Sequence, residues 1–126
     1  MTDLFVDSSA VIAIAFTEPN AIVARRRFRA ARRVQAAQLL EAEVRAACRR
    51  EDRSFDEQLL GAIEWVLPDR SLGVEIDRVL AAGHLGGADC WHLAMALFAA
   101  PDPHHATFLT LDVRQRAVAK ALGFRV

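Results

Sequence analysis

The sequence lacks any apolar run long enough to cross a bilayer, because charged residues interrupt each hydrophobic stretch well before the roughly 20 residues that a spanning helix needs. Its first residues also lack the basic leader and the long apolar segment of a secretory signal. We therefore expect a cytoplasmic protein that has no membrane partner.

Cysteine is scarce. Cys48 and Cys90 are far apart and form no CxxC pair. This spacing argues against a disulfide framework and against a structural zinc site. Both cysteines are expected to be buried thiols.

Lysine is almost absent, since Lys120 is the single lysine among 16 basic residues, which balance 16 acidic residues to a formal net charge of zero. Nine of the arginines lie within residues 21–50, beside only Glu41 and Glu43. One surface is therefore expected to be basic. Arginine suits bidentate phosphate contacts, but a GC-rich genome explains such usage equally well, and both interpretations stay open.

The chain has 126 residues and a hydrophobic content of 53%, which suits one domain over residues 1–126 with its own core. Short apolar runs predict strands over residues 4–6, 34–36, 65–67, 108–111 and 124–126. Helical periodicity predicts helices over residues 10–16, 21–31, 39–50, 55–63, 71–82, 89–100 and 112–122. Because parallel neighbours need crossover connections, this alternation predicts an α/β fold, a three-layer α/β/α sandwich with a central, mainly parallel sheet.

Local signals mark where several of these helices begin and end. Ser8 or Ser9 is expected to cap the first helix, and Ser54 forms a capping box with Glu57 for the helix over residues 55–63. Gly123 is expected at the C-terminal cap of the last helix.

Two aspartates follow predicted strands. Asp7 and Asp112 would emerge at the carboxyl ends of parallel strands, which is the edge where open α/β sheets form their ligand crevices. Each also has a structural interpretation. Asp7 suits a cap or turn, and Asp112 has capping-box spacing to Gln115.

Two further acids lie on predicted helices. Glu43 is expected in the middle of an apolar helix face made by Leu39, Leu40, Ala46 and Ala47, where an acid is costly unless it finds a partner. Glu41, in contrast, projects toward Arg45 as a solvated charge.

Asp89 begins the most apolar helix, where its structural interpretation is an N-cap. His92, one turn later, is placed to orient Asp89, although a core histidine without a catalytic role is the more common case.

Four acids that converge would repel one another and raise their pKa values until a cation relieved the site. Carboxylate oxygens suit Mg²⁺ or Mn²⁺, whereas the histidines and cysteines show no zinc spacing. The expected ligands of such an ion are Asp7, Glu43, Asp89 and Asp112.

These residues resemble the PIN-domain family, and within it the VapC-type toxins of prokaryotic toxin–antitoxin pairs. The resemblance spans the whole chain and rests on four segments and a C-terminal stretch: FVDSSA at 5–10, EVRAA at 43–47, ADCWHLA at 88–94, TLD at 110–112, and residues 119–123. Each segment is short, but their order and spacing are quite specific.

The resemblance implies a metal-dependent endoribonuclease in which Asp7, Glu43, Asp89 and Asp112 hold Mg²⁺ or Mn²⁺ and Thr110 lies near the metal. It also implies a cognate antitoxin, structured RNA such as tRNA as substrate, and a homodimer. The arginine-rich segment then becomes a candidate RNA-backbone contact or, equally, a solvated helix face. Its candidate residues are Arg25, Arg26, Arg29, Arg32 and Arg33.

Two other functions fit parts of the sequence. A phosphoacceptor receiver domain has a similar length and sheet, but that family resembles a pattern with adjacent acids after the first strand and a lysine just beyond a late strand. Here Asp7 is single and Lys120 lies inside a predicted helix. The second alternative is a catalytically silent RNA- or protein-binding module that uses the arginines alone.

Overall fold

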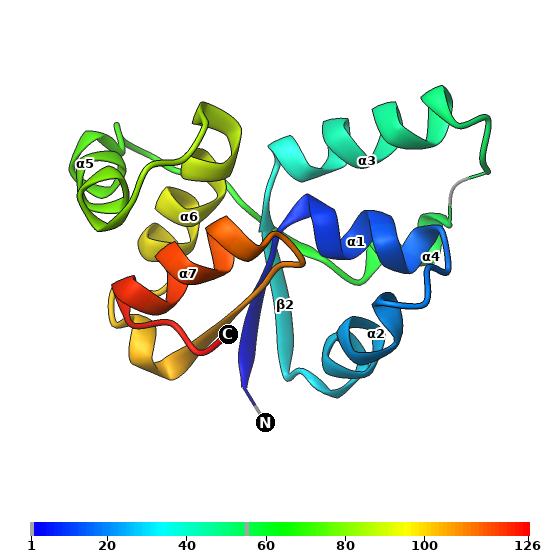
Figure 1. The fold of residues 1–126 in the computed structure, drawn as a ribbon, viewed down its shortest axis with the longest axis horizontal. Helices are drawn as coiled ribbons and strands as arrows, with labels where there is room; N and C mark the ends of the chain where they lie inside the picture. Colours follow the sequence, from blue (N-terminus) through cyan, green and yellow to red (C-terminus); the bar gives the residue numbers. More distant parts are fainter. Residues whose placement is uncertain (1, 55) are drawn as a thin grey trace.

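A computed structural model describes residues 2–54 and 56–126. Its elements alternate between strands and helices along the chain (Figure 1). The strands are β1 (Asp3–Val6), β2 (Arg33–Ala37), β3 (Glu64–Val66) and β4 (Ala106–Leu109). The helices are α1 (Ser8–Ala15), α2 (Ala21–Ala30), α3 (Leu39–Arg50), α4 (Glu57–Gly61), α5 (Gly73–Ala82), α6 (Gly87–Ala99) and α7 (Val113–Leu122), with a short 3₁₀ turn, η1 (Pro103–His105), before β4.

The four strands form one parallel sheet in the order β3-β2-β1-β4. The chain leaves β1 toward β2 on one side and returns to pair β4 on the other side of β1. This change of direction makes the carboxyl ends of β1 and β4 the topological switch point, where open parallel sheets form ligand crevices.

Helices cover both faces of the sheet, as Figure 1 shows with α1 to α4 on one side and α5 to α7 on the other. Alternate residues of each strand point to opposite faces. Leu4 and Val6 therefore pack with the helices α1 to α4, whereas Phe5 and Phe108 stack at 6.0 Å in the second core, under α5 to α7. The predicted α/β/α sandwich is confirmed, and its sheet is entirely parallel among the described residues.

Several predicted boundaries differ from the structure. Residues 124–126 form no strand and make only one bridge, between Arg125 and Thr107. The first helix begins earlier than expected because Asp7, not a serine, is its cap. Asp56 caps α4, not Ser54, and residue 55 lies outside the described residues.

Other local predictions are confirmed. Gly123 adopts the left-handed conformation at the end of α7, with φ of 107°. Cys48 and Cys90 are buried free thiols. No helix within the described part of the chain is long and apolar enough to cross a membrane.

Candidate active site at the carboxyl edge of the sheet

Asp7 lies at the switch point and is buried. It directly follows β1 and caps α1, since its Oδ2 accepts a hydrogen bond from the backbone N–H of Ser9 at 3.0 Å. The same carboxylate therefore caps the helix and is the expected functional group, and the cap holds its Oδ2 atom in place.

Asp112 follows β4 and caps α7. Its Oδ1 accepts a hydrogen bond from the N–H of Gln115 at 2.8 Å, which is the first half of the predicted capping box. The second half is replaced, because the N–H of Asp112 donates to Thr110 Oγ1 at 3.1 Å and not to the side chain of Gln115. Asp112 is exposed and Thr110 is buried beside it.

Glu43 lies at the edge of the buried face of α3, not in its middle as expected. That face consists of Leu40, Val44, Ala47 and Cys48. The side chain of Glu43 keeps 31% of its surface exposed, and its Oε1 lies 2.5 Å from Nε2 of His92 on α6. Glu41 pairs with Arg45 at 2.8 Å, on the side of α3 that was predicted, but its side chain is 29% exposed, so the two glutamates do not differ in burial as expected.

His92 is fully buried but contacts different acids from the one expected. Its Nε2 lies against Glu43 and 3.7 Å from Asp7 Oδ1, whereas no hydrogen bond joins it to Asp89. Its Nδ1 has no hydrogen-bond partner among the described residues. His92 is therefore a link between two of the acids and not an ordinary satisfied core histidine.

Asp89 lies in the first turn of α6 and does not cap it, because the N-cap residue is Gly86. Partial burial raises the pKa of the Asp89 carboxyl above its usual value, and the negative charges of Asp7, Asp112 and Glu43 raise it further. His92 opposes this shift. The hydrogen bonds of Gln115 to Asp7, to the Asp89 carbonyl and to Asp112, together with the contacts of His92 to Glu43 and Asp7, place all four acids in one region.

The four acids converge without meeting. Within residues 2–54 and 56–126, no three His, Cys, Asp or Glu side chains stand close enough together to form a metal-binding group. The donor set still fits a hard divalent cation, because every candidate ligand is a carboxylate and their mutual repulsion is relieved by positive charge.

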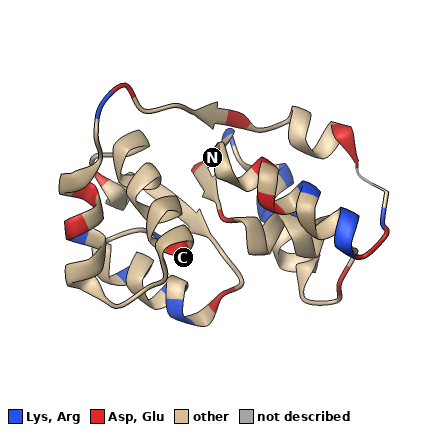
Figure 2. Cartoon of the chain, turned by 90° about the horizontal axis from the view of Figure 1, so that it is seen from above, with Lys and Arg blue, Asp and Glu red and all other residues tan. Residues whose placement is uncertain are grey.

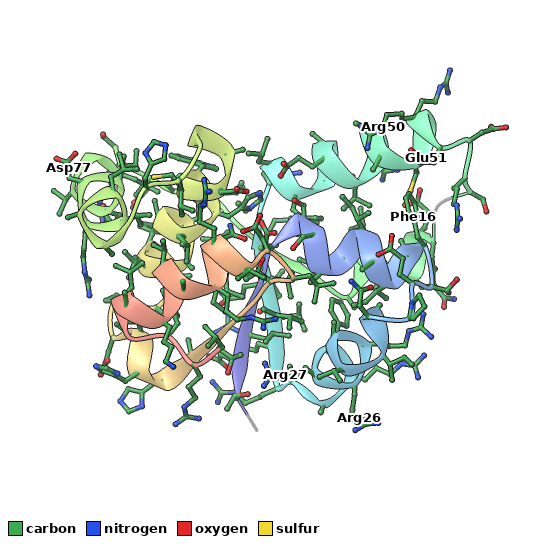
Figure 3. The ribbon with its side chains drawn as sticks, viewed as in Figure 1. Phe16, Arg26, Arg27, Arg50, Glu51 and Asp77 are labelled. Carbon is green, nitrogen blue, oxygen red and sulfur yellow. The ribbon has the colours of Figure 1, made fainter. Side chains whose placement is uncertain are left out.

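The arginines predicted to bind RNA lie away from these acids. Arg32 and Arg33 stand at the amino ends of the strands, where they pair with Asp3 at 2.9 Å and Glu64 at 2.7 Å. Arg26, labelled in Figure 3, lies toward the same edge of the sheet as the N-terminus in Figure 1. Figure 2 shows basic and acidic segments interspersed over both halves of the molecule.

Residues 4–121 of the chain match the sequence-family model of the PIN domain. The chain belongs to the PIN-domain family. No curated protein and no solved structure was found to be similar to it. Membership of the PIN-domain family indicates a nuclease-type function and assigns the chain to a different family from the receiver domains.

Two residues of this PIN domain's site were not singled out from the sequence as functional. Ser9 Oγ accepts from the N–H of Leu111 at 3.0 Å and lies 3.1 Å from Thr110 Oγ1. Gln115 is fully buried, with its side chain among the acids. Their sequence signals are a serine two residues after a strand-end aspartate and a polar residue on the inner face of the last helix.

Proposed function

We propose that this PIN domain is a Mg²⁺- or Mn²⁺-dependent endoribonuclease, the toxin of a toxin–antitoxin pair, and that it cleaves structured RNA such as tRNA. The observation that carries this proposal is the placement of four carboxylates around the switch point of the sheet, where His92 lies against Glu43 and Asp7 and Gln115 joins Asp7 to Asp89. Family membership supplies the nuclease class.

Asp7, Glu43, Asp89 and Asp112 would hold the ion, and the chemistry that it supplies is activation of water and stabilisation of charge at phosphorus. The protein itself orients the acids. Asp7 is fixed by the N–H of Ser9, Glu43 by His92, and Asp112 by its cap to α7. The hydroxyl oxygen of Thr110 supports Asp112 by accepting a hydrogen bond from the backbone N–H of Asp112.

The surface of α2 would bind the antitoxin and, because it lies away from the acids, RNA phosphates distant from the cleaved bond. Arg26 and Arg29 form no salt bridge with any described residue, which leaves both free to contact phosphates. Ile22 and Val23, in the first turn of the same helix, are 62% and 60% exposed, which suits a surface that a protein partner covers. The exposed Val74 of α5 is a second apolar surface residue, and we propose that it lies in the interface of a homodimer.

The substitution Asp7→Asn tests the proposal. Asparagine caps helices as well as aspartate does, so α1 is expected to keep its cap while a carboxylate is lost. Cleavage of a folded RNA in Mg²⁺ should fall by more than about 100-fold, because even indirect partners of a metal ligand are worth 10–100-fold. The measurement is the rate of Mg²⁺-dependent cleavage, with EDTA as the metal-free comparison.

Asp77→Asn is the matched control, since Asp77 is exposed on α5 and forms no salt bridge with any described residue (Figure 3). This variant should cleave at the wild-type rate. Equal rates for Asp7→Asn and wild type, or cleavage that persists in EDTA, would contradict a metal-dependent nuclease at this site.

A further inference from the structure

Gln115 is buried in a way that its place in the helix does not require. It occupies the third position of α7 and is 0% exposed, although glutamine at this position usually reaches back to the capping residue. Thr110 already satisfies the N–H of that residue, Asp112. The side-chain amide of Gln115 is therefore free for other contacts.

Those contacts reach two more of the acids. Nε2 of Gln115 donates to Asp7 Oδ1 at 3.3 Å and to the backbone carbonyl of Asp89 at 3.2 Å, and Oε1 accepts from Thr110 Oγ1 at 2.7 Å. Together with the bond from its own N–H to Asp112, one residue thus contacts three of the four acidic residues.

The directions of these bonds fix how the amide faces. Thr110 has one hydroxyl proton, and its shortest contact is the one to Gln115 Oε1. Ser9 Oγ accepts from the N–H of Leu111 and lies 3.1 Å from Thr110 Oγ1, and since the single Thr110 proton goes to Gln115, Ser9 must be the donor in that contact. If the amide were reversed, its oxygen would face the Asp7 carboxylate and the Asp89 carbonyl, two groups that only accept. The NH₂ group must therefore face the acids.

A neutral donor in this place has a specific consequence. A lysine or arginine would orient Asp7 but would also neutralise it and compete with a metal ion for its oxygens. The amide orients the carboxylate and leaves its negative charge available. It also ties α6, through the carbonyl of Asp89, to the end of β1.

We propose that Gln115 is a positioning residue that sets the geometry of Asp7 and Asp89 for a divalent cation. This inference rests on the proposed metal-dependent function. Residues that orient metal ligands through hydrogen bonds commonly contribute 10–100-fold to metal affinity. Gln115 would do so directly for the Asp7 carboxylate, and for Asp89 through the backbone carbonyl of that residue.

Gln115→Met tests this role, since methionine is close in length and lacks both the donor and the acceptor. Binding of Mn²⁺ to the RNA-free protein is measured by isothermal titration calorimetry, and folding is checked by thermal unfolding in EDTA. We expect Mn²⁺ affinity to fall at least about tenfold. Gln58→Met is the control, because Gln58 is exposed on α4 and its side chain has no partner among the described residues.

A second variant, Gln115→Asn, carries the test if the methionine variant does not fold. It keeps a polar amide, but one methylene shorter, so it cannot reach Asp7 and Asp89 together, and the same loss of affinity is expected. A folded Gln115 variant that binds Mn²⁺ like Gln58→Met overturns the positioning role and leaves the proposed nuclease intact. Failure of the wild-type protein to bind Mn²⁺ overturns the metal-dependent function itself and the positioning role with it.

Discussion

The hydroxyl of Thr110 joins the two strand ends at the switch point, and Thr110→Val removes it with little change in shape. Valine leaves Gln115 Oε1, which is fully buried, without its donor at 2.7 Å, and leaves the N–H of Asp112 without its acceptor. An unsatisfied buried acceptor costs about 1–3 kcal/mol. The exposed Asp112 can hydrate its N–H, and the added methyl group returns about 0.8 kcal/mol at most.

When the full methyl contribution is subtracted, the expected net loss from Thr110→Val is about 0.2–2.2 kcal/mol. The assay is urea unfolding in EDTA, so that metal binding does not contribute. Thr107→Val is the matched control, because Thr107 lies buried on β4, three residues before Thr110, and its hydroxyl has no partner among the described residues. That variant should stay within about 0.5 kcal/mol of wild type. Equal stability of the two variants would refute the assigned network.

Two further predictions concern packing and charge. A Cβ added at Gly83 would lie 2.7 Å from Cγ2 of the buried Val118, so Gly83→Ala should lose about 1–3 kcal/mol in urea unfolding, whereas Gly61→Ala in α4, whose Cβ meets nothing within 4 Å, should not. Equal stabilities of the two variants would contradict this prediction and show that α5 and α7 can move apart at little energetic cost. The raised pKa of Asp89 means that the folded state holds this proton more tightly than the unfolded state, so the contribution of Asp89 to stability should fall as pH rises above about 4. Asp89→Asn should reduce that fall by at most about 1 kcal/mol because the side chain is partly exposed, and pH profiles that coincide in EDTA would contradict the repulsion.

The fold was predictable because its signals are local and periodic. The helix over residues 39–50 was predicted with the boundaries that the structure shows, since its apolar spacing and its polar flanks agree. The strand over residues 124–126 was predicted wrongly. A short segment rich in strand-forming residues after a glycine cap has strand composition whether or not it pairs along its length with the sheet, and here it forms a single bridge.

The site was less predictable, because its contacts join residues that are distant in sequence. The strand-end positions of Asp7 and Asp112 follow from parallel topology alone. The pairing of His92 with Glu43 does not, since it depends on how α6 and α3 are placed on opposite faces of the sheet, and sequence spacing favoured Asp89 instead. Likewise, the spacing of Gln115 predicted a capping box, and only the position of Thr110 shows why its side chain turns to Asp7.

The geometry of the four acids depends on how the two helical layers meet at the sheet. Glu43 belongs to α3 on one face, Asp89 and Gln115 belong to α6 and α7 on the other, and Asp7 stands between them at the end of the shared strand β1. The polar contacts at the site cross this boundary, since His92 reaches Glu43 and Gln115 reaches Asp7. Because each helical layer packs on its own core, a shift of the layer α5 to α7 would move Asp89 and Asp112 relative to Asp7 and Glu43. These cross-layer hydrogen bonds are therefore what converts a stable α/β/α fold into a defined arrangement of carboxylates.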